Sequence, residues 1–184
     1  QFLLVSESVE VEGVFADYGA CLEADPGYSA AWMNRGALRN EYGDFAGAEA
    51  DMVEALRLRP EDPWALVNRG VARKALGDIP GAIADYDEAI RLGPGIAIAW
   101  SNRAAARYEA KDFDASMADA EQAIRLAPEL AGAWRNRANV HFVRGDLDLA
   151  LRDYTESLRL NPRDPTVWLN RAIVRRMIGD LAGA

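Results

Sequence analysis

Few side chains in this sequence could carry acid–base, nucleophilic or metal chemistry. His141 is the only histidine and Cys21 the only cysteine, and one residue of each type cannot supply the ligands of a structural zinc site. Asp85 and Asp87 are two residues apart, so on a helix they would face different ways. No glycine-rich phosphate-binding loop is present. The sequence therefore predicts a chain that is not an enzyme and that holds no metal or cofactor.

A row of asparagines has the residue type and spacing for a different task, which is binding a peptide backbone. A carboxamide offers both a donor and an acceptor, so it can pair with both groups of an extended main chain. We call these residues the asparagine column, and they recur every 34 residues: Asn34, Asn68, Asn102, Asn136 and Asn170. The alternative is a polar, solvated helix surface, but such a surface rarely requires five identical residues. We therefore take this column as the candidate binding residues.

The same period runs through other positions of the chain. Small residues, aspartates and prolines recur in step at Gly36, Gly70, Ala104, Ala138 and Ala172, at Asp44, Asp78, Asp112, Asp146 and Asp180, and at Pro26, Pro60, Pro94, Pro128 and Pro162. Small residues let two helices approach closely, a Gly–Asp pair joins a left-handed helix end to an N-cap, and proline ends a helix. Lys111 precedes Asp112 where the other repeats have glycine, so a slightly strained turn is expected there.

These positions, with Trp32, Trp100, Trp134 and Trp168, resemble the tetratricopeptide repeat, a helix–turn–helix unit of this length. The resemblance covers essentially the whole chain and implies an all-α, right-handed superhelical solenoid that forms one domain over 1–184. The implied repeats are 1–28 (partial), 29–62, 63–96, 97–130, 131–164 and 165–184 (partial). Helices are predicted over 11–24, 29–42, 45–58, 63–76, 79–92, 97–110, 113–126, 131–144, 147–160 and 165–178, with residues 1–8 as the remains of an earlier first helix.

Helical geometry gives the asparagine column a direction. Asn34 falls about 200° from Trp32 around a helix, away from the buried side, so the column should face the concave groove. The other residues expected to line this groove are Met33, Val67, Arg135, Asn139 and Leu169. The column resembles the asparagine ladder of the O-linked N-acetylglucosamine transferases, which implies contacts to a peptide main chain.

The chaperone-binding clamp modules of the same family are a poorer comparison. They grip a terminal carboxylate with lysine and arginine on neighbouring first helices. The aligned positions here carry no lysine and hold Ala30, Trp64, Ile98, Gly132 and Thr166. Recognition of an acidic chaperone tail is therefore not expected.

A second polar column lies next to the buried side and should be structural. An arginine there needs an anionic partner, because an unpaired buried charge is costly. We predict a ladder of ion pairs between Arg35, Arg69, Arg103, Arg137 and Arg171 and the second-helix residues Asp17, Asp51, Asp85, Asp119 and Asp153. The aspartate for Arg171 would lie past Ala184, so this arginine is predicted to lack an in-repeat partner. His141 replaces arginine in the neighbouring column of Arg39, Arg73, Arg107 and Arg175, which favours a role in packing.

Charge and hydropathy narrow the classes of partner. The net charge of −8 disfavours nucleic acid and anionic membranes. No apolar run approaches the roughly 20 residues of a membrane span, and the first residues lack the basic region of a signal peptide, so a cytoplasmic protein is expected. Val174 and Ile178 are expected to lack cover, so the C-terminal end should contact another copy or a downstream segment.

The function predicted from these observations is a protein–protein interaction scaffold that binds an extended segment of a partner in its concave groove. The alternative is a regulatory or substrate-recruiting part of a larger enzyme. RNA binding, as in the related pentatricopeptide solenoids, is disfavoured by the acidic balance.

Overall fold

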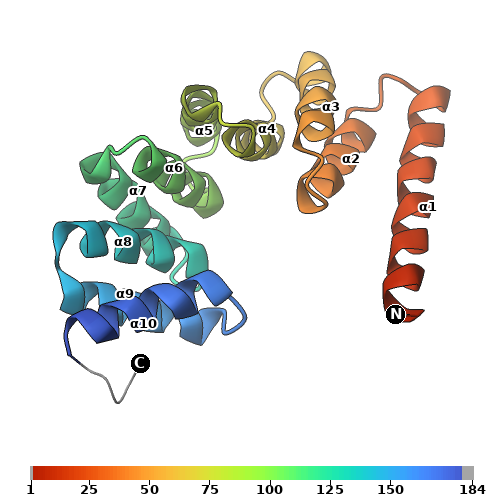
Figure 1. Cartoon of the computed structure of the whole chain (residues 1–184). Helices are drawn as coiled ribbons and strands as arrows, with labels where there is room; N and C mark the ends of the chain where they lie inside the picture. Colours follow the sequence, from red (N-terminus) through yellow and green to blue (C-terminus); the bar gives the residue numbers. More distant parts are fainter. Residues whose placement is uncertain (1, 180–184) are drawn as a thin grey trace.

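Short turns join the helices of this chain into one curved stack. A computed structural model describes the backbone of residues 2–179 and the side chains of residues 11–179 (Figure 1). Within this part of the chain there are ten helices and no strand: α1 (Phe2–Ala24), α2 (Ser29–Glu41), α3 (Phe45–Leu58), α4 (Pro63–Ala75), α5 (Ile79–Leu92), α6 (Ala97–Glu109), α7 (Phe113–Leu126), α8 (Ala131–Arg144), α9 (Leu147–Leu160) and α10 (Pro165–Met177). The fold is the all-α, right-handed solenoid that the repeats predicted.

The turn between the two helices of a repeat depends on one left-handed residue. Gly43, Gly77, Gly145 and Gly179 have φ angles of 81°, 89°, 83° and 81°, a region that favours glycine. Lys111 occupies the same place with φ 64°, which confirms the expected strain at this turn. The aspartate that follows caps the next helix in three repeats. The side chains of Asp44, Asp78 and Asp112 accept from the backbone N–H three residues on, at 3.0, 2.9 and 3.3 Å.

The prediction for the N-terminus was wrong in one respect. Residues 1–8 were expected to belong to a separate helix, but α1 runs without a break from Phe2 to Ala24. The positions that hold Gly–Asp in other repeats hold Val9 and Glu10 here. A β-branched residue is strongly disfavoured at positive φ, so the chain has no means to turn and the helix continues.

Each hairpin closes where its first helix has a small residue. A Cβ added to Gly70 would lie 2.5 Å from Cε1 of Tyr86, and one added to Gly36 would lie 2.8 Å from Cε of Met52. The second helix therefore presses a large side chain onto bare backbone at these two places.

The apolar interior is divided into two clusters. The N-terminal cluster extends from α3 to α6 and is built around Met52, Leu66, Tyr86 and Ile90. The C-terminal cluster extends from α8 to α10 and contains Tyr154, Leu158, Val167 and Val174. The expectation that Val174 lacks cover was wrong, because this side chain is fully buried against the preceding second helix. Ile178 is 39% exposed, as expected.

The stack curves because its two layers are spaced differently. The successive first helices α2, α4, α6 and α8 contact one another, whereas the second helices mainly contact the first helices on either side. The first helices therefore form the inner wall. Figure 1 shows the resulting open arc, with α1 at one end and α10 at the other.

Candidate functional site

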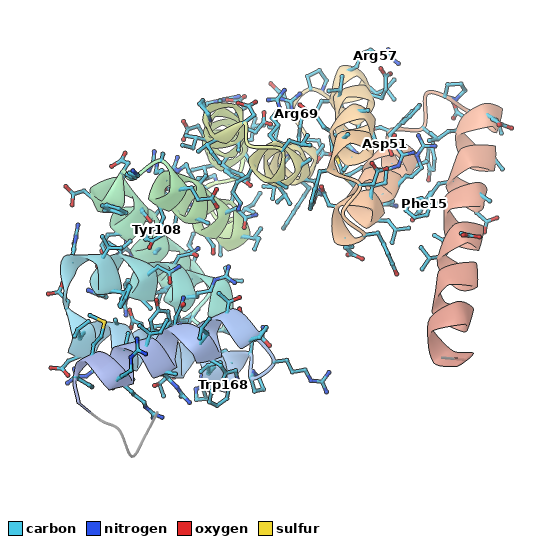
Figure 2. All side chains as sticks on the ribbon, viewed as in Figure 1. Phe15, Asp51, Arg57, Arg69, Tyr108 and Trp168 are labelled. Carbon is cyan, nitrogen blue, oxygen red and sulfur yellow. The ribbon has the colours of Figure 1, made fainter. Side chains whose placement is uncertain are left out.

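The predicted Arg–Asp ladder is present in the four complete repeats. A guanidinium nitrogen lies 2.6–2.7 Å from a carboxylate oxygen in the pairs Arg35–Asp51, Arg69–Asp85, Arg103–Asp119 and Arg137–Asp153. These aspartates are at most 5% exposed. In Figure 2, Asp51 lies between α2 and α3, whereas Arg57 points outward. The ladder therefore holds the two helices of each pair together through buried carboxylates.

The environment of the ladder favours its charged forms. Hydrogen bonds from the guanidinium groups to Asp51 and Asp153 raise the pKa of Arg35 and of Arg137 above the ordinary value. The arginines also lie 4.3–4.9 Å from the ring centres of Trp32, Trp100, Trp134 and Trp168. Each of these indoles in turn donates to the carbonyl of the proline six residues earlier, at 2.8–2.9 Å. The recurring polar and aromatic positions on this side are thus structural.

His141 lies in the ladder and not in an open site. Its Nδ1 is 3.5 Å from Asp146 and its Nε2 is 3.9 Å from Asp153. In the other repeats the same place holds Arg39, Arg73 and Arg107, which reach the buried aspartate at 2.9, 3.0 and 2.8 Å. This position is consistent with the role in packing that the sequence predicted. The described residues contain no cluster of three His, Cys, Asp or Glu side chains that could hold a metal ion.

The structure treats the five asparagines of the column differently. Asn34 is exposed, and Asn68, Asn102 and Asn170 are half-buried. Asn136 is 4% exposed, and its amide donates to the backbone carbonyl of Ser101 at 2.7 Å and to the Ser101 hydroxyl at 3.2 Å. These two bonds join α8 to α6, so the Asn136 amide already has partners within the solenoid.

The other predicted groove residues also divide into exposed and engaged side chains. Leu169 is 62% exposed, whereas Val67 is 4% exposed, and Met33 is half-buried against the N-terminal cluster. Two polar members make bonds within the solenoid. Arg135 binds Asp164 at 3.1 Å, and the Asn139 carbonyl accepts from the Tyr154 hydroxyl at 2.7 Å.

One feature of the site was not predicted. An apolar pocket of about 380 Å³ is lined by Trp64, Ile96, Ile98 and Leu130, with Glu129 as the one charged residue among the described residues that line it. It lies where the first turns of α4 and α6 and the loop before α8 meet, and Trp64 is 52% exposed there. The signal was present in the sequence, since Trp64 stands two residues before the tryptophan position, which Leu66 occupies in this repeat.

These features define a helical repeat solenoid: helix pairs stacked at a constant interval, an internal ladder of ion pairs and an inner wall of first helices. A family model described as tetratricopeptide repeat matches residues 131–164, and a second model with the same description matches residues 41–95 and 67–131. The chain belongs to the tetratricopeptide repeat family. None of its described helices combines the length and apolar character needed to cross a membrane.

Solved structures with this fold share little sequence with the chain. TTC0263, a thermophilic tetratricopeptide repeat protein of Thermus thermophilus, is 17% identical with a TM-score of 0.75, over 94% of each chain. YrrB, described as having an unusual peptide-binding site, is 19% identical with a TM-score of 0.67, over 91% of this chain and 86% of its own.

A third solved structure has a bound peptide. It is the first repeat domain of Spaghetti (RPAP3) bound to the HSP90 peptide SRMEEVD, 22% identical with a TM-score of 0.60, over 64% of this chain and 93% of its own. A comparison with curated protein sequences finds no match. At these identities the likeness shows the fold.

Proposed function

We propose that this chain is a non-catalytic scaffold that binds an extended segment of a partner protein along the inner wall of first helices. The observation that carries the proposal is the pair Asn68 and Asn102. Both are partly exposed on the neighbouring helices α4 and α6. Neither side chain makes a hydrogen bond to another described residue. Two similar solenoids, RPAP3 with its bound peptide and YrrB, support the choice of a peptide as the ligand.

The spacing of the column suits an extended backbone. First helices of neighbouring repeats are roughly 10 Å apart, and an extended chain advances about 3.3 Å per residue, so one asparagine would meet every third residue or so. From its first to its last member, the column would span on the order of ten to twelve residues of such a chain. Asn136 would contribute indirectly, by fixing α8 against α6, because its amide is already bonded to Ser101.

The apolar pocket would select side chains of that segment. Trp64, Ile98 and Leu130 offer a concave apolar surface at the edge of the inner wall, which suits a bulky aliphatic or aromatic side chain. Glu129 and the net charge of −8 disfavour an acidic segment. The expected ligand is therefore an extended, neutral or basic segment with at least one large apolar residue.

A selection followed by binding measurements tests the proposal. Twelve-residue peptides would be selected on the parent protein from a random display library, and their affinity measured by fluorescence anisotropy. The double variant Asn68→Ala/Asn102→Ala should bind about 30-fold more weakly, because several backbone hydrogen bonds of about 1 kcal/mol each are lost. The matched control Asn161→Ala changes an exposed asparagine in the turn after α9 and should bind normally.

Two results of this experiment would count against the proposal. One is a double variant that remains folded by circular dichroism and binds every selected peptide as the parent does. The other is selected peptides without large apolar residues whose binding is insensitive to Trp64→Ala, which would remove the pocket from the account.

A further inference from the structure

A second apolar pocket lies on the layer of second helices. It has a volume of about 570 Å³ and is lined by Ile79, Pro80, Ile83, Ala84, Asp87 and Ala110. Five of these residues belong to α5, and Ala110 directly follows the C-terminal end of α6. The pocket shares none of its described lining residues with the asparagine column or with the pocket at Trp64, so it is a separate surface.

The pocket opens at a position where this repeat has a short side chain. The residue before the left-handed turn position is large at the four glycine turns: Tyr42, Leu76, Arg144 and Ile178. At the turn between α6 and α7 this residue is Ala110, which lines the pocket. The space beside α5 is thus left open by an alanine, where the other described turns carry a longer side chain.

The next repeat shows how the equivalent place is closed. Asp114 on α7 and Arg144 at the end of α8 hold the positions of Pro80 and Ala110, and the side chains of Asp114 and Arg144 form an ion pair. Pro80 and Ala110 cannot form such a pair. The apolar side chains beside them on α5 are therefore left uncovered.

A cation stands next to this opening. Lys111 directly follows Ala110, is exposed, and has a φ angle of 64° where the four equivalent residues are glycine. A side chain costs stability at this angle, and none of the described carboxylates forms an ion pair with Lys111. Nearby acids are already engaged, since Asp87 binds Arg103 at 2.5 Å and Asp112 caps α7. The rim of the pocket therefore carries a positive charge that no described acid neutralises.

From the pocket and the cation beside it we infer a second protein-binding site, which takes a segment of a partner with a large aliphatic side chain next to an aspartate or glutamate. The aliphatic group packs on Ile79 and Ile83, which are half-buried and line the pocket, and the carboxylate binds Lys111. Pockets of about 300–1,000 Å³ can hold a drug-sized ligand, so there is room for more than one side chain. The inference is independent of the groove, whose expected ligand is a neutral or basic segment.

A selection with depletion tests this site. A random twelve-residue display library would first be passed over immobilised Ala110→Leu, in which a leucine like Leu76 fills the pocket, and then captured on the parent protein. The depletion step removes peptides that bind elsewhere, the groove included. The recovered peptides should contain leucine, isoleucine or valine beside an acidic residue. The methyl NMR signals of Ile79 and Ile83 should shift when such a peptide binds.

Two variants separate the apolar and the charged contributions. Fluorescence anisotropy should show at least about tenfold weaker binding to Ala110→Leu, because burial of the aliphatic side chain is lost. Lys111→Gly should bind about two- to fivefold more weakly, the effect of losing an exposed ion pair. The same variant should melt at a higher temperature than the parent, because glycine relieves the left-handed turn. A residue with a structural role alone would not combine weaker binding with greater stability.

The matched control is Ala118→Leu, the same change at an exposed alanine of α7, which should bind the peptides as the parent does. Three outcomes would overturn the inference. The first is that no recovered peptide binds the parent more tightly than Ala110→Leu, although circular dichroism shows both proteins to be folded. The second is binding that leaves the signals of Ile79 and Ile83 unshifted. The third is a set of peptides without acidic residues that bind Lys111→Gly as tightly as the parent.

Discussion

Each of the two apolar clusters contains a tyrosine at the same position of the repeat. The hydroxyl groups of the two tyrosines differ in their hydrogen bonds. Tyr86 in the N-terminal cluster is 0% exposed, and its buried hydroxyl bonds to no described residue. Burial, reinforced by the charge of Asp85, raises the pKa of Tyr86 well above its ordinary value. Tyr154 in the C-terminal cluster is 1% exposed, and its hydroxyl donates to Asn139. One cluster therefore depends on apolar contact alone at this position, and the other adds a polar bond.

The two halves of the candidate binding surface differ in the same way, in how far their polar side chains are already bonded. In the C-terminal half, Asn136 and Asn139 are bonded to neighbouring helices and help to hold the stack together. In the N-terminal half, Asn34 is exposed and Asn68 and Asn102 are half-buried, and none of the three side chains makes a hydrogen bond to a described residue. The asparagines of one half thus form bonds within the solenoid, and those of the other half do not.

Between the clusters, α7 buries mainly small or polar side chains, with Met117 as the one larger apolar residue. Ser116 replaces alanine at its position and donates to the carbonyl of Ala104 at 2.8 Å. Arg103 is the most extensively bonded arginine here, with two bonds to Asp119 and one to Asp87 at 2.5 Å. Because neighbouring repeats contribute stability through their shared interfaces, this polar joint should control whether the two clusters unfold together.

Removing Arg103 should cause the two clusters to unfold independently. This is the largest effect expected. Arg103→Ala leaves Asp119, which is 2% exposed, with Arg107 as its remaining cation. The free energy of unfolding should fall by about 3 kcal/mol, the lower end of the cost of breaking a buried ion pair. Calorimetry should then resolve two transitions where the parent shows one.

The control for this change is Arg125→Ala, which removes an exposed arginine bonded to Gln122 on the same helix. Its melting curve should match that of the parent. A single, unshifted transition for Arg103→Ala would mean that the joint does not couple the clusters.

The two tyrosines provide a matched pair of intermediate size. Tyr154→Phe should lower the free energy of unfolding by about 1–2 kcal/mol, because the Asn139 carbonyl loses its bond from the hydroxyl. Tyr86→Phe removes a hydroxyl that has no partner among the described residues, so it should be neutral or slightly stabilising. Urea unfolding of the two variants checks the sign of the difference, and equal losses would contradict the contrast between the clusters.

The sequence predicted the helices and the ladder well because both depend on local rules repeated at a fixed interval. Gly43, Gly77 and Gly145 marked their turns, and Lys111 was correctly expected to be strained. The element predicted wrongly, α1, has Val9 and Glu10 where the other repeats have the Gly–Asp pair. A helix break was predicted there from the repeat period alone. Helix boundaries could thus be read from single residues, but only where those residues are present.

The candidate site was less predictable because the angle of a side chain around its helix does not say what lies opposite it. Asn136 occupies the same repeat position as Asn102. Its amide, however, lies opposite Ser101 and donates to both the carbonyl and the hydroxyl of that residue. The pocket at Trp64 depends on the loop before α8, two repeats away along the chain. Both features arise from contacts between repeats, which a position in one repeat cannot reveal.

The smallest effect expected comes from restoring an arginine to the C-terminal cluster. Three repeats place two arginines on the buried aspartate, whereas Asp153 has only Arg137 and a more distant His141 among the described residues. His141→Arg should supply the second guanidinium and also approach Asp146, which now lies 3.5 Å from the imidazole. The expected gain in the free energy of unfolding is about 0.5–1 kcal/mol. The new guanidinium would be partly buried, and the carboxylates of Asp146 and Asp153 already lie close to this position. Urea unfolding at neutral pH measures it, and a loss of stability would show that the C-terminal repeat has packed around imidazole too closely to accept the longer side chain.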